Sequence, residues 1–262
     1  MPVLAARGVE LAWTERGEGP PALLVHETAA SAEVWDEVAA DLSASARAIA
    51  YDRRGWGSSS APDDYRRTTV EEQSEDAAAL IESLDAGPAA LCAAGVGAVI
   101  ALDLVLRRPE LVSGAVLIEP PLLQLLPTAT EALSDDRLRL ETVVGEGGNV
   151  IDLYLSGGLP ALGAGVTRVP ERIAAQARER PSSVIAELGL PAGWRMPLPR
   201  LAGAERPSLI VVSQSTPPLL RAAAEALAGR LAESSLREVD SGRQAPHVGA
   251  PAMIAALVTD QL

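Results

Sequence analysis

The feature that most constrains the fold of this chain is an alternation of short apolar runs with longer segments of helical periodicity. The run 22–25 precedes a helical pattern over 31–42, and the run 46–51 precedes one over 69–84. Thr69 and Glu72 have the spacing of a capping box at the start of the second pattern. Such alternation is typical of a mostly parallel sheet with helices on both faces, so we predict an α/β fold.

The alternation is interrupted once, between residues 122 and 200. This stretch is rich in Pro and Gly, has short helical patterns and lacks a clear strand, whereas a strand pattern returns at 208–212. We predict that residues 1–121 and 201–262 form the core and that 122–200 form a helical cap insertion over the sheet.

The composition limits the chemistry that the chain can carry out. The chain has 22 Arg and no Lys. It has one Cys (Cys92) and two His (His26 and His247), so few side chains can act as a thiol nucleophile, an imidazole base or a zinc ligand. Without Lys, a Schiff base and a Lys-containing phosphate loop are excluded. One Cys and two His exclude a Cys-rich zinc site and an internal disulfide. We therefore predict neither a metal nor an organic cofactor.

The charge limits the partners. A net charge of -13 disfavours nucleic acid and anionic membrane surfaces as partners. No apolar run approaches the ~18 residues of a membrane span, and no signal peptide pattern is present, so we expect a cytoplasmic protein. With 3% aromatic residues, a pocket is expected to be lined by Leu, Val and Ala, which suits an apolar small molecule. A homodimer is an open alternative.

Three sequence motifs follow one another in the predicted core. They are His26 after an early strand, the turn 51–55 (Tyr-Asp-Arg-Arg-Gly), and 117–121 (Leu-Ile-Glu-Pro-Pro). Together with the order of elements, they resemble the α/β-hydrolase superfamily over nearly the whole chain, and especially the small actinobacterial hydrolases. The resemblance implies an α/β-hydrolase fold and a site with a Ser at a nucleophile elbow, an acid and a late His.

At the expected catalytic positions the sequence departs from the family. The elbow reads Ala-Ala-Gly-Val-Gly over 93–97, so Gly95 stands at the Ser position and no side chain there can form a covalent intermediate. Counting back seven residues from Pro251 places Gln244 where the late His is expected. His247 follows three residues later, and we predict a structural or pocket-rim role for it. We predict a degenerate triad.

Two Glu residues are the remaining acids. Glu119 ends the strand of the 117–121 motif, where some relatives carry their acid, and a purely structural use of it is equally open. Glu27 stands where relatives have Gly, and it either points into the pocket or lies outward near the first helix. In a water-poor pocket the pKa of a carboxylate rises, which makes it a usable general acid or base.

The binding residues are expected around the elbow. The resemblance implies oxyanion donors at the backbone of Thr28 and at the helix start formed by Gly95 and Val96. Trp194, in the predicted insertion, is a candidate for ligand contact, and we expect Gln244 and His247 at the rim of the same pocket.

Three functional hypotheses remain open. The first is a non-hydrolytic enzyme (a cyclase, lyase or isomerase) acting on an apolar carbonyl compound, for which the resemblance implies natural-product (antibiotic) biosynthesis. It would use Glu27 with His26 or Glu119 for proton transfer. The second is a catalytically inactive ligand-binding protein. The third is an esterase in which Ser213 or Ser215 serves as a displaced nucleophile.

Overall fold

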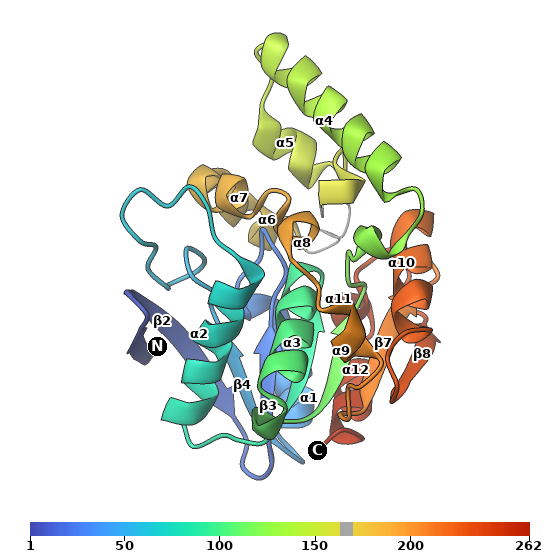
Figure 1. Cartoon of the computed structure of the whole chain (residues 1–262). Helices are drawn as coiled ribbons and strands as arrows, with labels where there is room; N and C mark the ends of the chain where they lie inside the picture. The colour runs from blue at the N-terminus through green and yellow to red at the C-terminus, as the bar shows by residue number, and fades with distance from the viewer. Residues whose placement is uncertain (163–169) are drawn as a thin grey trace.

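Eight strands form one sheet in the order β1-β2-β4-β3-β5-β6-β7-β8 in the computed structural model (Figure 1). The structure describes residues 1–162 and 170–262, and residues 163–169 of the predicted insertion lie outside the described part. The pairs β1–β2 and β2–β4 are antiparallel, and every later pair is parallel. The predicted α/β fold with a mostly parallel sheet is confirmed. The strands are β1 Val3–Ala6, β2 Val9–Arg16, β3 Pro21–Val25, β4 Arg47–Tyr51, β5 Ala89–Ala94, β6 Val112–Ile118, β7 Ser208–Ser213 and β8 Ser234–Val239.

Helices cover both faces of this sheet. The α-helices of the core are α1 Asp36–Leu42, α2 Val70–Ser83, α3 Val96–Arg107, α10 Pro218–Ala228, α11 Pro246–Gly249 and α12 Pro251–Thr259. The 3-10 helix η1 Ala32–Trp35 leads into α1, and η2 Pro109–Leu111 leads into β6. The short helix α11 has no counterpart in the sequence pattern, which predicts a helix only from Pro251.

The period of two in the strands separates two hydrophobic layers. Leu23, Leu91 and Leu117 point to the face covered by α2 and α3, whereas Leu24 and Cys92 point to the face covered by α1 and α12. Cys92 is fully buried, and burial raises the pKa of its thiol. It therefore serves as a small apolar core residue.

The start of α2 shows how local sequence determines an element boundary. Thr69 has an extended backbone, and its side chain accepts a hydrogen bond from the N–H of Glu72 at 3.1 Å. The carboxylate of Glu72 does not return the bond to Thr69 but accepts one from the hydroxyl of Thr68 at 2.8 Å. The predicted helix start is confirmed, with half of the capping box formed.

All regular elements that the structure describes in the segment between β6 and β7 are helices. Its elements are η3 Leu123–Leu125, α4 Ala129–Gly145, α5 Val150–Leu155, η4 Pro160–Leu162, α6 Glu171–Glu179, α7 Pro181–Glu187, α8 Leu190–Gly193 and α9 Leu198–Leu201. Figure 1 shows α4 and α5 farthest from the strands, whereas α6 to α8 lie between them and the sheet. We call this segment (residues 119–207) the β6–β7 segment.

Candidate active site

The carboxyl ends of four neighbouring parallel strands bring the candidate residues to one edge of the sheet. Strand β5 lies between β3 and β6, and β7 follows β6. Glu27 comes two residues after β3 ends, Gly95 directly after β5, and Glu119 directly after β6. Ser213 is the last residue of β7. In open α/β sheets, ligands bind at this edge.

The turn between β5 and α3 has the shape of an elbow. Gly95 adopts φ +53° and ψ -124°, a conformation that side chains rarely tolerate. Its N–H donates to the carbonyl of Ile118 at 2.9 Å, so this N–H is used structurally. The first N–H groups of α3, beginning with Val96, have no acceptor within the helix. The donors expected at the elbow therefore lie at Val96 and Gly97 rather than at Gly95.

Gly97 holds the start of α3 against the end of β3. A Cβ added at Gly97 would lie 2.5 Å from the carbonyl oxygen of Val25 and 2.6 Å from that of His26. Only glycine permits this approach. Because Glu27 directly follows His26, its backbone lies beside the helix start.

Glu27 turns inward and meets His247. The Nε2 atom of His247 lies 3.3 Å from Oε1 of Glu27, and only 1% and 2% of the two side chains are exposed. Within the described residues, no hydrogen-bond partner is found for either Glu27 oxygen or for either ring nitrogen of His247. Buried polar atoms without such partners are costly and rare in structural roles, so this pair is the best candidate for chemistry.

Trp35 covers the pair from the end of η1. Its ring centroid lies 4.6 Å from that of His247, at an interplanar angle of 37°. The indole Nε1 of Trp35 is also buried and has no acceptor among the residues that the structure describes. A third residue with a buried polar atom that lacks a hydrogen-bond partner thus lies beside the same imidazole.

His26 is structural, which corrects its predicted catalytic role. Its Nδ1 is 2.7 Å from the carbonyl oxygen of Glu27, and its Nε2 accepts from the N–H of Arg53 at 3.0 Å. Burial and the charge of Arg53 lower the pKa of His26 well below its usual value of 6.5, so the ring is neutral. Both nitrogens are engaged, and none is left to exchange a proton with a ligand.

The neutral state of His26 makes stability depend on pH. Below about pH 6.5 the unfolded chain takes up a proton that the folded chain excludes, so the free energy of unfolding falls by up to about 1.4 kcal/mol per pH unit. Above that pH this residue contributes no slope. Urea denaturation at about pH 7.5 and about pH 5.5 will show a steeper loss for the wild type than for His26→Asn. Equal slopes for the two proteins would contradict this assignment.

Glu119 holds the end of β7. Its backbone has φ +47°, and its N–H donates to the carbonyl of Val211 at 2.9 Å. Its Oε1 accepts hydrogen bonds from the hydroxyl of Thr216 and, at 3.4 Å, from that of Ser213. Of the two interpretations open from the sequence, this geometry favours the structural one.

A comparison of the sequence with protein families agrees with the observed α/β fold. The model of a family described as "Alpha/beta hydrolase family" matches residues 22–257. The chain belongs to the alpha/beta hydrolase family. The family resemblance inferred from the motifs is thereby confirmed.

Named relatives of this alpha/beta hydrolase family member match only part of it. The uncharacterized hydrolase YraK of Bacillus subtilis is 37% identical over 123 residues, which are 47% of this chain and 45% of that protein. The putative non-heme bromoperoxidase BpoC of Mycobacterium tuberculosis H37Rv is 36% identical over 111 residues, 42% of this chain and 41% of that protein. The matches thus span less than half of these relatives' length.

Solved structures resemble the alpha/beta hydrolase chain over nearly its full length. Epoxide hydrolase VrEH1 from Vigna radiata gives a TM-score of 0.75 at 22% identity and covers 99% of this chain and 96% of its own. The enol-lactonase from Burkholderia xenovorans gives 0.71 at 20% identity, with 99% of both chains covered. At such identity the likeness shows the fold alone.

The late loop of this alpha/beta hydrolase differs from the sequence expectation. Gln244 is exposed, and its N–H donates to the carbonyl of Ser241 at 3.2 Å. Pro246 does not keep His247 away from the interior but begins α11, which carries His247 inward. Of the structural or pocket-rim role predicted for His247, the rim position does not agree with a residue that is only 1% exposed, and it is His247 rather than Gln244 that reaches the candidate site.

Trp194 does not reach the strand edge and lines a separate cavity of about 420 Å³, so its ligand contact stays a prediction, but it shares no pocket with Glu27 and His247. Its Nε1 donates to Oδ1 of Asp103 at 3.0 Å, and its ring packs in the core layer of α2 and α3. Asp103 lies seven residues after Val96 in α3. At 1.5 Å of rise per residue, this is about 10 Å along the helix from the elbow.

Thr28 and Glu187 form a buried cluster that sequence reasoning missed. Glu187, at the end of α7, accepts from the Thr28 hydroxyl at 2.5 Å and pairs with both terminal nitrogens of Arg53 at 2.5 and 3.0 Å. Trp56 Nε1 and Gln73 Nε2 donate to its Oε1 at 3.0 and 3.1 Å. We call these five residues the Glu187 cluster. The Thr28 side chain is thereby tied to the β6–β7 segment.

The Glu187 carboxylate is ionised in the folded protein. Burial alone would raise its pKa, but the charge of Arg53 and the hydrogen bonds outweigh burial and lower it below the usual value. No signal in the sequence marked Glu187, because it stands in a short helix without a motif.

In the described part of the chain, no group of three or more His, Cys, Asp or Glu side chains could hold a metal ion. None of its helices is long and apolar enough to cross a membrane.

Proposed function

We propose that this member of the alpha/beta hydrolase family is a proton-transfer enzyme of the lyase, isomerase or cyclase type rather than a serine hydrolase. The observation that carries the proposal is the buried pair of Glu27 and His247, 3.3 Å apart, beside an elbow whose central residue is Gly95. Proton transfer needs a base and a place for developing negative charge, and it needs no nucleophile.

The chemistry assigned to the pair is removal of a proton from carbon next to a carbonyl group. The Glu27 carboxylate takes the proton, and the electron pair of the C–H bond moves into an enolate. The N–H groups of Val96 and Gly97, at the start of α3, stabilise the enolate oxygen together with the helix dipole. Returning the proton to a different atom yields an isomer, and attack of the enolate carbon on a second carbonyl closes a ring.

The substrate class follows from the surroundings of the pair. Trp35, whose ring lies against that of His247, is buried in an apolar layer. We therefore propose an apolar carbonyl compound, and natural-product biosynthesis is the setting that the family resemblance implied. The names of the relatives are mostly those of hydrolases. The proposal for this chain differs from those names because Gly95 stands where a serine hydrolase would carry its nucleophile.

The proposal is tested with α-tetralone, an apolar ketone whose exchangeable protons lie next to the carbonyl. The wild-type protein in D2O should accelerate deuterium incorporation, read by mass spectrometry, over buffer alone. The same preparation should neither react with a fluorophosphonate nor hydrolyse p-nitrophenyl butyrate. In a serine hydrolase an activated hydroxyl carries out both of these reactions.

Two other outcomes would each overturn the proposal. Fluorophosphonate labelling lost in Ser213→Ala or Ser215→Ala would indicate an esterase with a displaced nucleophile. The observation that favours it is the 3.2 Å contact between the two hydroxyls. Absence of exchange, together with a small molecule that stays bound through purification, would indicate an inactive ligand-binding protein. The observation that favours this alternative is the near-complete burial of Glu27 and His247.

A further inference from the structure

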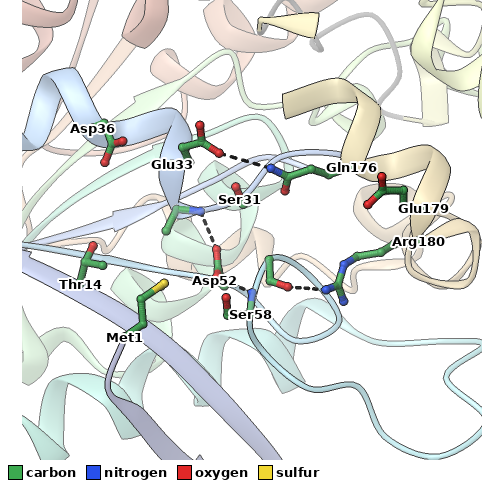
Figure 2. Close-up of a pocket in the computed structure, with 12 residues that line it drawn as sticks. Met1, Thr14, Ser31, Glu33, Asp36, Asp52, Ser58, Gln176, Glu179 and Arg180 are labelled. Carbon is green, nitrogen blue, oxygen red and sulfur yellow. Dashed lines mark hydrogen bonds between the residues drawn. The ribbon is translucent and has the colours of Figure 1, made fainter. Parts of the chain in front are cut away.

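Two cavities away from the strand edge differ in how their charged groups are used. The first has a volume of about 560 Å³ and lies between residues of η1 and α1 on one side and residues of α6 on the other (Figure 2). The acids Glu33 and Asp36 each pair with an Arg. Asp52 accepts two backbone N–H groups, each at 2.7 Å, and Arg180 donates to two backbone carbonyls. These charged groups are already used, so they select no charged ligand.

The second cavity, of about 420 Å³, is the one that Trp194 lines. It lies between the start of α2 and the part of the chain that contains α8, and its volume is within the range of small-molecule sites. Arg67 lines it from the first side and Arg195 from the second. Neither Arg forms an ion pair or a side-chain hydrogen bond with another residue in the described ranges 1–162 and 170–262. Both guanidinium groups therefore remain available to a ligand.

The charge of the second cavity is opposite to that of the whole chain. Its lining holds two Arg and one acid, Glu71, which leaves one net positive charge. The chain as a whole carries -13. A guanidinium group has five N–H donors and no acceptor, and its planar shape matches a carboxylate. The charged part of this lining therefore favours a small anion over a cation.

Apolar side chains form another part of the wall of the second cavity. Val70, Leu190 and Trp194 line it, and each of these residues is at most 7% exposed. The Nε1 atom of Trp194 already donates to Asp103 at 3.0 Å, so the indole offers a ligand apolar contact rather than a hydrogen bond. Contact between a hydrocarbon chain and such side chains is favourable in proportion to the area removed from water. A ligand that uses both parts of the lining has an anionic head and an apolar chain.

We propose that the second cavity binds an aliphatic carboxylate. The carboxylate group lies at Arg67 and Arg195. The hydrocarbon chain lies against Val70, Leu190 and Trp194, which gives Trp194 a ligand contact at a site other than the strand edge. A carboxylate is chosen over a phosphate ester because a phosphate group brings up to two negative charges to a lining with one net positive charge. This proposal does not depend on the proposed proton transfer.

Sodium octanoate is the probe, and isothermal titration calorimetry measures its dissociation constant. Arg67→Gln and Arg195→Gln should each weaken octanoate binding about threefold, the effect of one exposed ion pair, and the double variant about tenfold. Glu71→Gln should tighten binding by up to about threefold, because it removes the opposing charge. A packing defect would not produce such a gain. The two Arg variants should unfold at the wild-type temperature without ligand, because neither Arg has an ion pair within the described protein to lose.

Related ligands test the head and the chain separately. Octylammonium has the same chain and the opposite charge, and it should bind about tenfold more weakly than octanoate, although the net charge of -13 attracts cations. Butanoate should also bind about tenfold more weakly, because its shorter chain loses contact with the apolar wall. The bromine of 8-bromooctanoate should quench the fluorescence of Trp194, and this quenching should be lost in Trp194→Phe.

Matched variants separate this site from its surroundings. Arg66→Gln changes the residue next to Arg67, but Arg66 pairs with Asp64 and lies outside the cavity. This variant should bind octanoate as the wild type does. Glu27→Gln should also leave octanoate binding unchanged, so this proposal and the proposed proton transfer can fail separately.

Four results would overturn the proposal. One is the absence of octanoate binding to the wild type. Another is equal octanoate affinity in the wild type and the double Arg variant, which would place the carboxylate elsewhere on the surface. The third is equal affinity for octylammonium and octanoate, which would show that the cavity does not recognise negative charge. The fourth is bromine quenching that persists in Trp194→Phe, which would place the hydrocarbon chain away from this wall.

Discussion

Glu187→Ala will lower the free energy of unfolding by about 3–5 kcal/mol, because it leaves the buried guanidinium of Arg53 without its counter-charge. In the wild type the carboxylate receives two nitrogens of Arg53 and the donors of Thr28, Trp56 and Gln73. All four partners come from the core and Glu187 from α7, so the loss also loosens the β6–β7 segment. Urea denaturation measures the first effect, and faster amide hydrogen exchange in residues 181–193 measures the second.

A double variant distinguishes an unpaired charge from a packing defect. Arg53→Met with Glu187→Leu removes both charges and should recover much of the lost stability, since apolar replacement of a whole buried pair is often neutral. Glu141→Ala, which breaks an exposed pair with Arg137, is the control and should change little. If Glu187→Ala unfolds like this control, the Glu187 cluster does not hold the segment.

The stability that the Glu187 cluster contributes should be lost only at low pH, when the Glu187 carboxylate takes up a proton. The pKa of Glu187 is lowered in the folded chain, so its contribution to stability is present above the pKa of the unfolded state and is lost as the pH falls toward the folded value. The pKa of His26 is also lowered, and its effect on the free energy of unfolding begins below about pH 6.5. As the pH falls, the loss of stability due to His26 therefore begins before the loss due to Glu187.

The elements of the core were accessible from sequence because their signals are local. The runs 22–25 and 46–51 agree with β3 and β4 within one residue, and Thr69 begins α2 as its spacing with Glu72 predicts. In the β6–β7 segment, α7, α8 and α9 were not predicted, because each has seven residues or fewer and all three contain Pro at the first or second position. Helices this short depend on tertiary packing rather than on periodicity.

The candidate site was accessible only in part. The absence of a nucleophile at Gly95 and the unusual Glu27 follow from alignment with known motifs, and the inward direction of Glu27 was one of two open alternatives. Its partner His247 lies near the other end of the chain, and nothing in the residues 244–251 indicates that α11 turns it inward. Contacts between such distant positions depend on the packing of loops, which periodicity does not describe.

Glu27→Gln will lower the rate of deuterium incorporation into α-tetralone by about 10²–10⁴-fold, the range that a positioned general base contributes. The amide fills the same space and cannot take a proton, so unfolding by urea should change much less than the rate. His247 contacts the carboxylate and acts as a positioning residue. His247→Gln should therefore reduce the rate less and shift its pH profile, which loss of packing alone would not do.

The control for this loss is a buried carboxylate away from the strand edge. Asp103→Asn keeps an acceptor for Trp194 Nε1 and should retain the wild-type exchange rate. Wild-type exchange in Glu27→Gln would remove the acid–base role of this residue, whatever the effect of His247→Gln. Equal losses in Glu27→Gln and Asp103→Asn would mean that any buried charge change disturbs the site, and the role assigned to Glu27 would lack support. A loss confined to Glu27→Gln, with a shifted pH profile in His247→Gln, is the pattern that only a carboxylate base aligned by an imidazole produces.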